Sequence, residues 1–128
     1  MIELSSRVLI PRRMEGRIEK LIQDYIKNGC KGDLDLRDAS ITELPPNLKK
    51  VGGSLWLNRS KITKLPDDLQ VDGGLYLDNT AITELPKGLK VGGFIDISDT
   101  PLSKKYSEDQ IKKMIQDLGG SVKGTIYA

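Results

Sequence analysis

The chain of 128 residues contains no histidine and only one cysteine, Cys30. Without histidine it cannot form Ser–His or Cys–His nucleophilic pairs, and most zinc sites are excluded as well. One cysteine cannot form an intramolecular disulfide. The glycine pairs are not followed by Lys-Ser or Lys-Thr, so the sequence has no phosphate-binding glycine loop. These absences predict a protein that is not an enzyme and that binds no metal ion or other cofactor.

Three further absences concern the compartment and the partners. No hydrophobic run reaches the length of about 18 residues that a membrane-spanning helix needs. The N-terminal residues lack the basic and then apolar order of a secretory signal peptide. The net charge of +2 is too small to indicate binding to a nucleic acid or a membrane. We therefore expect a single cytoplasmic domain without a membrane partner.

What the chain does have is a repeat. Four strand-like triplets recur at intervals of 21, 20 and 20 residues: Leu34-Asp35-Leu36, Leu55-Trp56-Leu57, Leu75-Tyr76-Leu77 and Ile95-Asp96-Ile97. Each of the first three precedes Ile-Thr-x-Leu-Pro-x-x-Leu, a valine and a glycine pair. A fixed period of this length is typical of a solenoid, in which each turn stacks on its neighbours. The alternating leucines predict short parallel strands, and the prolines predict an extended or 3₁₀ return.

The segments on either side of the repeat have other patterns. Five apolar residues follow the spacing of an amphipathic helix, which we expect over residues 13–28: Ile18, Leu21, Ile22, Tyr25 and Ile26. Residues 8–11 are compatible with a short extended segment. Ser107 and Gln110 fit a capping box at the start of a second helix, and residues 122–127 alternate as one last strand would.

Together these patterns predict an α/β fold in a single domain over residues 1–128. Its centre is a solenoid of about 3.5 turns at 32–102, with a parallel strand face and a fourth turn that is not completed. Because the open ends of a solenoid expose apolar surface, we interpret 1–31 as a helical N-terminal cap. Residues 103–128 are interpreted as a helix-plus-strand C-terminal cap.

The repeat resembles the leucine-rich repeats of the short Leu-Pro class, which occur in bacterial effectors and in proteins of bacteriophages and other mobile elements. The resemblance implies a protein-binding solenoid and, for a phage-encoded chain, action in the host cytoplasm. Family members usually carry asparagine three residues after the second strand leucine, where this chain has Ala39, Ser60, Thr80 and Thr100. In family members the amide of this asparagine satisfies backbone groups in the turn. The hydroxyls of Ser60, Thr80 and Thr100 can replace part of these hydrogen bonds, whereas Ala39 cannot, so we expect the first turn to depend on its cap.

The predicted strand face concentrates aromatic residues. It holds three of the six aromatic residues in the chain, including the only Trp and the only Phe. Strands favour aromatic residues in any case, but three neighbouring exposed rings would form an apolar patch, which generally has a function. Aromatic residues and arginines are also the usual anchors of binding sites. We predict a partner-binding site of Trp56, Tyr76, Phe94, Arg37, Arg59, Asn58, Asp78 and Asp96.

These residues predict a non-catalytic protein–protein interaction module. The resemblance adds the hypothesis that it is a phage- or mobile-element-encoded inhibitor of a host protein. By strand geometry the four-row face covers roughly 250 Å² in projection, whereas a standard interface buries about 800 Å² per partner. Either a cap contributes, the chain self-associates, or the ligand is narrow, such as a peptide or loop. The sequence leaves the oligomeric state open.

The alternative is a nucleic-acid-binding protein. Residues 1–32 contain an excess of three basic over acidic side chains. Trp56 and Tyr76 could each stack on a base, as aromatic residues do in single-strand binding. The aspartates on the strand face would repel phosphates, which disfavours this alternative.

Overall fold

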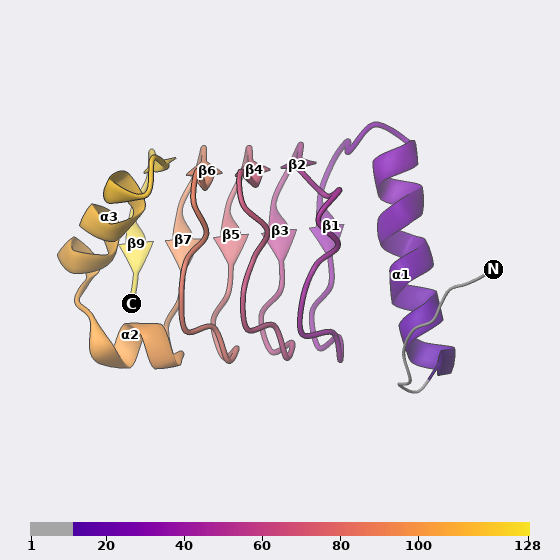
Figure 1. The fold of residues 1–128 in the computed structure, drawn as a ribbon, viewed down its shortest axis with the longest axis horizontal. Helices are drawn as coiled ribbons and strands as arrows, with labels where there is room; N and C mark the ends of the chain where they lie inside the picture. The colour runs from indigo at the N-terminus through magenta and orange to yellow at the C-terminus, as the bar shows by residue number, and fades with distance from the viewer. Residues whose placement is uncertain (1–11) are drawn as a thin grey trace.

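The computed structural model describes residues 12–128, so the extended segment predicted at 8–11 lies outside the described residues. The repeats stack side by side along one axis, with a helix at each end of the stack (Figure 1). This is the parallel-strand solenoid that the period predicted.

One side of the solenoid is a five-stranded parallel sheet. Its strands are β1 (Leu34–Asp35), β3 (Leu55–Trp56), β5 (Leu75–Tyr76), β7 (Ile95–Asp96) and β9 (Ile126–Tyr127), and they lie in that order (Figure 1). The register aligns the first leucine of each triplet, with Leu34 opposite Leu55 and Leu55 opposite Leu75. The side chain after that leucine therefore falls in one line across the sheet.

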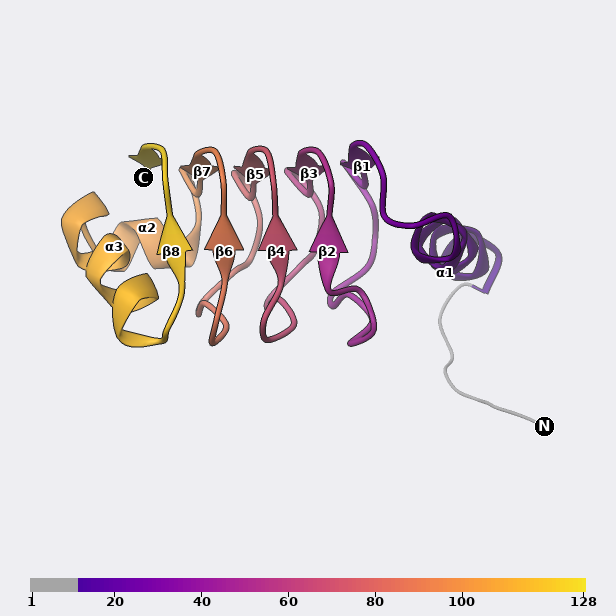
Figure 2. The same cartoon turned by 90° about the horizontal axis from the view of Figure 1, so that it is seen from above.

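A second parallel sheet of four strands forms another side. It consists of β2 (Lys50–Val51), β4 (Gln70–Val71), β6 (Lys90–Val91) and β8 (Ser121–Val122), which lie side by side in Figure 2. Val51 pairs with Val71 and Val71 with Val91. Because Lys50 pairs with Gln70, the extra residue of the first repeat lies before β2 and leaves both sheets in register.

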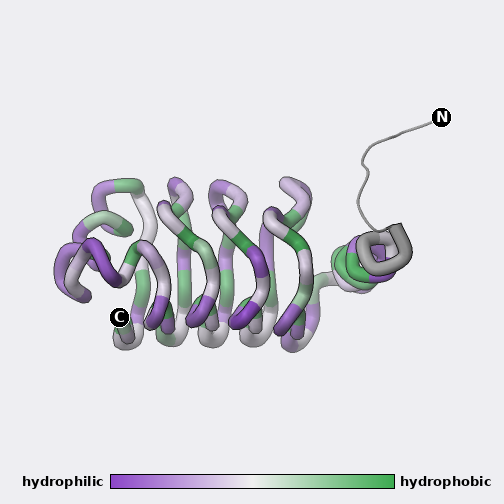
Figure 3. The backbone as a smooth tube through the Cα atoms, turned by 90° about the horizontal axis from the view of Figure 1, so that it is seen from below, coloured by the Kyte–Doolittle hydropathy of each residue, from purple (hydrophilic) through white to green (hydrophobic). Residues whose placement is uncertain are grey.

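The core lies between the two sheets and the proline-containing returns. All the repeated apolar positions are buried, and many are fully inaccessible, such as Leu55, Leu57, Ile62, Leu75 and Leu77. Hydrophobic stretches recur at matching places in successive turns (Figure 3). Burying one such side chain stabilises the fold by about 1.5–3 kcal/mol. The repeat pattern therefore supplies the folding energy, and the outward positions are free to vary.

The returns contain no helix between β1 and β7, as the prolines predicted. In the first return the Leu48 N–H donates to the Pro45 carbonyl at 3.0 Å, which closes a tight turn. Buried hydroxyls occupy the position three residues after the second apolar residue of the triplet in the second, third and fourth repeats. Thr80 Oγ1 donates to the Leu77 carbonyl at 2.7 Å, and Thr100 Oγ1 donates to the Ile97 carbonyl at 2.6 Å. Each hydroxyl thus satisfies a carbonyl at the corner after the strand.

The N-terminal cap is α1 (Arg12–Lys27), which lies beyond β1 at the end of the sheet (Figure 1). Ile22 is buried, and Ile18, Tyr25 and Ile26 are half-buried against the core. Leu21, predicted on the same apolar face, is instead 46% exposed. The spacing placed it on the apolar stripe, but only the face centred on Ile22 meets the first repeat.

Tyr25 joins this cap to the first repeat. Its hydroxyl contacts the Gly32 carbonyl at 2.6 Å and the Cys30 carbonyl at 3.0 Å, and it accepts from the Gly52 N–H at 3.2 Å. A hydroxyl has one proton, so it donates to one of these carbonyls at a time. Tyr25 thus links α1 to the backbone on either side of β1, and the dependence of the first turn on its cap stays a prediction.

The C-terminal cap contains α2 (Pro101–Lys105) and α3 (Glu108–Asp117). The predicted capping box is present: Ser107 Oγ accepts from the Gln110 N–H at 3.2 Å, and Gln110 Oε1 accepts from the Ser107 N–H at 2.8 Å. The prediction of one strand over 122–127 was wrong. Residues 121–122 join the four-stranded sheet and 126–127 join the five-stranded sheet.

The reason for this difference is that the chain must turn between the two sheets, as it does in every earlier repeat. It turns at Gly124, whose N–H donates to the Gly93 carbonyl at 2.9 Å. The two helices take the place of the fourth proline-containing return. The last turn is therefore completed, where the sequence predicted that it would stop short.

Candidate interaction face

Four aromatic side chains form a continuous line across the five-stranded sheet, which we call the aromatic row: Trp56, Tyr76, Phe94 and Tyr127. Trp56 and Tyr76 are stacked with ring centroids 3.9 Å apart and planes at 5°. Phe94 meets Tyr76 edge to face at 5.0 Å and 89°, and meets Tyr127 at 5.8 Å and 74°. The structure thus brings together the three aromatic residues predicted from the sequence and adds a fourth.

Register explains the line only in part. Trp56 pairs with Tyr76, and Asp96 pairs with Tyr127, in successive strands. Phe94 comes one residue before β7, at the position that holds Ser54 and Gly74 in the two preceding repeats. Its ring reaches the row because Gly74 has no side chain: a Cβ at Gly74 would lie 2.9 Å from Phe94 Cζ.

The ring faces of Trp56 are occupied from both sides. Tyr76 stacks on Trp56, and the guanidinium carbon of Arg37 lies 5.3 Å from the Trp56 ring centroid. This cation–π arrangement holds Arg37 over the start of the row. The row therefore presents Trp56 to solvent by its ring edge.

Both predicted arginines are engaged in bidentate ion pairs. Arg37 donates to Asp35 through Nε at 2.9 Å and Nη2 at 2.7 Å. Arg59 donates to Asp38 through Nε at 2.8 Å and Nη2 at 3.2 Å. These charged hydrogen bonds lower the pKa of Asp35 and of Asp38 and raise the pKa of each arginine. All four side chains are substantially exposed, so the pairs orient the arginines more than they stabilise the fold.

The carboxylates that the later repeats place on this face form no ion pairs with arginine or lysine side chains that the structure describes. Asp96 Oδ1 accepts from Ser98 through the backbone N–H at 3.0 Å and through Oγ at 2.6 Å. Asp78 has only a 3.5 Å contact with Asn79 Nδ2. Within residues 12–128, no ion pair to Asp78 or Asp99 is formed. These two carboxylates without an ion pair lie in the corners that follow β5 and β7.

Asn58 differs from its predicted role as an outward contact. It is only 8% exposed, and its side-chain oxygen Oδ1 has no hydrogen-bond partner within the described residues. The alternation of the strand placed Asn58 on the outer face, but the side chain lies in the corner after β3 and is covered. Asn58 is therefore not part of the exposed surface of the face.

At the register position of Trp56 and Tyr76, the strands on either side of them, β1 and β7, carry aspartates. Asp35 Oδ1 accepts from the Arg37 N–H at 3.1 Å, and Asp96 Oδ1 accepts from the Ser98 N–H at 3.0 Å. Both aspartates thus close a local turn in the manner typical of Asp and Asn. Trp56 and Tyr76 occupy the same place in β3 and β5 and cannot make that bond.

Tyr127 was missed by the sequence analysis, although its side chain is 50% exposed at the end of the row. A signal for it was present. Val122, Gly124 and Ile126 repeat the spacing of Val91, Gly93 and Ile95, which places Tyr127 in line with Asp96. The intervening helices lengthen the interval from 20 to 31 residues and hide the match.

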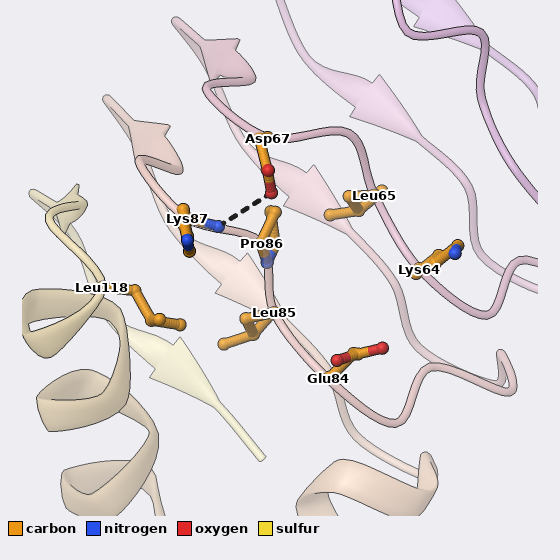
Figure 4. A pocket seen from close by; sticks show the side chains of 8 residues that line it. All are labelled: Lys64, Leu65, Asp67, Glu84, Leu85, Pro86, Lys87 and Leu118. Atoms are coloured by element: carbon orange, nitrogen blue, oxygen red, sulfur yellow. Dashed lines mark hydrogen bonds between the residues drawn. The ribbon is translucent and has the colours of Figure 1, made fainter.

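Other surfaces carry weaker features. A shallow hollow on the proline side is lined by residues of two neighbouring returns and the end of α3: Lys64, Leu65, Asp67, Glu84, Leu85, Pro86, Lys87 and Leu118 (Figure 4). Its charges are mixed, and the Lys87 N–H donates to Asp67 Oδ1 at 3.2 Å. No group of three His, Cys, Asp or Glu residues that could hold a metal ion occurs in the described part of the chain. None of the described helices is long and apolar enough to cross a membrane.

The aromatic row, its two ion-paired arginines and its free aspartates form the most distinctive surface of the structure. No family model, curated protein or solved structure matches this chain.

Proposed function

We propose that this protein is a non-catalytic interaction module that binds another protein through the aromatic row. One observation carries the proposal. At the positions of Trp56 and Tyr76 the flanking strands use aspartates that satisfy a backbone N–H. The middle strands lack that bond and instead carry large, half-buried rings on the outer side of the sheet. A line of apolar rings that is only partly covered is typical of a binding surface.

The size of the face limits the shape of the partner. Five strands about 4.8 Å apart span about 19 Å, and the strands and their corners span about 17 Å. This projected area is well below the roughly 800 Å² that each partner buries in a standard interface. The proposed ligand is therefore a narrow segment of a protein, such as an extended peptide or a projecting loop.

The contacts of the row favour a protein over a nucleic acid. A base would need an open ring face, and both faces of Trp56 are covered, by Tyr76 and by Arg37. The first strand, β1, lies between α1 and β3 (Figure 1), and the strand and its flanking residues carry Asp33, Asp35 and Asp38. A phosphate backbone that ran from the helix to Trp56 would have to cross them.

The proposal includes the mode of action. The module occupies the segment that it binds, and the resemblance to phage-encoded repeat proteins suggests inhibition of a host protein in the cytoplasm. Arg37 and Arg59 are held in place by their carboxylate partners, so they are preorganised to contact a ligand at one end of the row. Asp78 and Asp96 lie near the other end.

A random linear-peptide library displayed on phage tests the proposal. Selection on the wild-type protein is followed by binding measurements on the double variant Trp56→Asn/Tyr76→Asn. Asn retains the turn-closing acceptor that the flanking aspartates provide, so the variant removes the rings and preserves the local fold. Peptides that bind the wild type and lose at least about tenfold in affinity for the variant support the proposal. Peptides that bind both equally contradict it, and capture of a single-stranded oligonucleotide by the wild type alone would favour the nucleic-acid alternative.

A further inference from the structure

We infer that the ligand of the aromatic row is an extended, basic protein segment whose arginine or lysine side chains cross the rings and end at Asp78 and Asp99. This inference rests on the proposed function and adds the chemical class of the ligand. Three observations support it: the acidic charge of the face, the ion pairs that already occupy its two arginines, and the position of Asp78 and Asp99 in the corners that follow β5 and β7.

The face is strongly acidic in a chain whose net charge is +2. Its outward positions in β1, β3, β5 and β7 and in the corners that follow hold six aspartates and two arginines: Asp33, Asp35, Arg37, Asp38, Arg59, Asp78, Asp96 and Asp99. The remaining surface is therefore basic overall. This segregation of charge attracts a positively charged ligand to the aromatic face and repels an acidic one.

The two arginines do not neutralise the far end of this face. Arg37 is paired with Asp35 and Arg59 with Asp38, all near β1 and β3. Asp78 and Asp99 follow β5 and β7 and have no ion pair within the described residues. The charge of Asp78 contributes to the raised pKa of Arg59, so this carboxylate lies near that arginine without pairing with it. Among the described residues, Asp78 and Asp99 thus remain unpaired carboxylates in the corners that follow Tyr76 and Asp96.

We call Asp78 and Asp99 the acidic strip: they follow β5 and β7 at register positions one residue apart, on the corner side of the aromatic row. Asp78 comes two residues after Tyr76 in the chain, a distance of about 7 Å in extended backbone. An arginine or lysine has an apolar stem of similar length that can lie along ring edges while its charged end reaches a carboxylate. The planar guanidinium of arginine can also bind a carboxylate through two hydrogen bonds, which makes arginine the better fit.

The shape of the row favours an extended segment over a helix or a globular surface. The row runs across all the strands from Trp56 to Tyr127, with centroid steps of 3.9, 5.0 and 5.8 Å. An extended peptide laid along this line directs alternate side chains to the same side. Successive basic residues at alternate positions would therefore face the acidic strip.

The test uses the peptides selected from the random library on the full chain, with the double variant Asp78→Asn/Asp99→Asn. Its matched control is Glu43→Gln/Glu84→Gln, which removes the same charge from two exposed residues on the proline side. We expect enrichment of arginine and lysine in the selected peptides. Their affinity should fall about tenfold in the aspartate variant, fall with added salt, and remain unchanged in the control.

The other outcomes separate this inference from the proposed function. Peptides that depend on Trp56 and Tyr76 but are not basic, and that ignore Asp78→Asn/Asp99→Asn, overturn the inference and leave the proposed function standing. Selection of no peptide, or of peptides indifferent to Trp56→Asn/Tyr76→Asn, overturns both. A dimer in sedimentation that the aspartate variant breaks would identify a second copy as the occupant and would also overturn the inference.

Discussion

The phenyl ring of Phe94 lies over Gly74, in space that a side chain at position 74 would fill. A Cβ there would come within 2.9 Å of Phe94 Cζ and 3.0 Å of Cε2. Because Gly74, immediately before β5, has no side chain, Phe94 of the next repeat can join the aromatic row. Phe94 is not among the residues of the buried core, so this relationship ties the glycine of one repeat to the proposed binding face.

Gly74→Ala should displace the Phe94 ring and weaken its edge contact with Tyr76. We expect a loss of less than about 1 kcal/mol in the free energy of unfolding, since the clash is with a side chain that can move. Peptide binding should weaken as well. Gly93→Ala provides the contrast, because its Cβ would meet the Gly73 backbone oxygen at 2.9 Å. That substitution should cost about 2 kcal/mol or more, as measured by urea unfolding, and equal costs for the two would contradict the assignment.

Tyr25→Phe should loosen the N-terminal cap. The variant loses the hydroxyl that contacts the Cys30 and Gly32 carbonyls and the Gly52 N–H. Loss of these contacts should destabilise the fold by about 1–3 kcal/mol, with faster hydrogen exchange at Gly52. Ile26→Val, a small change in the same helix, is the control. An unfolding free energy equal to that of the wild type would show that Tyr25 does not fasten the cap.

The same tyrosine predicts a dependence of stability on alkaline pH. Burial raises the pKa of Tyr25 above its usual value near 10. Because the folded-state pKa is the higher one, this contribution is fully present below pH 10 and is lost as the pH rises through the folded-state value. Wild-type stability should decline over that range more steeply than that of Tyr25→Phe. Parallel curves for the two proteins would contradict the prediction.

The ion pairs on the strand face predict a dependence on acidic pH. Hydrogen bonds from Arg37 and Arg59 lower the pKa of Asp35 and of Asp38, respectively. Their folded-state pKa values lie below the unfolded value of about 3.9. The stabilisation is therefore present above that value and is lost as the pH falls through the folded-state values. In the double variant Arg37→Gln/Arg59→Gln, the free energy of unfolding in urea should fall less steeply as the pH is lowered. NMR titration of the carboxyl carbons of Asp35 and Asp38 should show higher pKa values in this variant than in the wild type.

Thr100→Val should destabilise the C-terminal cap more than Thr100→Ser. The fully buried Thr100 hydroxyl donates to the Ile97 carbonyl and accepts from the Ser103 N–H at 3.1 Å, which starts α2. Valine keeps the volume but leaves both groups without a partner, at a cost of about 1–3 kcal/mol. Serine keeps the hydroxyl. Equal unfolding free energies for the two variants would show that the hydroxyl does not hold this corner.

The solenoid could be predicted because its signal is repeated. The triplets that begin with Leu34, Leu55 and Leu75 each report the same register, so one irregular position such as Lys49 does not obscure it. The capping box at Ser107 is likewise a local pattern that needs no tertiary contact to be recognised. Buried positions of the repeat and local helix caps can thus be predicted from a single sequence.

The residues of the candidate site were harder to predict because their positions depend on contacts between repeats. Trp56 and Tyr76 followed from the period, whereas the direction of the Phe94 ring depends on the gap at Gly74. Tyr127 enters the row only after two helices have completed the last turn. The exposure of Leu21 and the burial of Asn58 also depend on how neighbouring segments pack, which alternation alone does not encode.

The most direct test of the account measures folding and binding on the same variant, Trp56→Asn/Tyr76→Asn. The account predicts that the free energy of unfolding falls by less than about 2 kcal/mol, since the ring stack is lost but the turn-closing acceptor is gained. The affinity for peptides selected on the wild type should fall at least about tenfold. Unchanged affinity, or loss of the folded state, would contradict the claim that the aromatic row exists for binding.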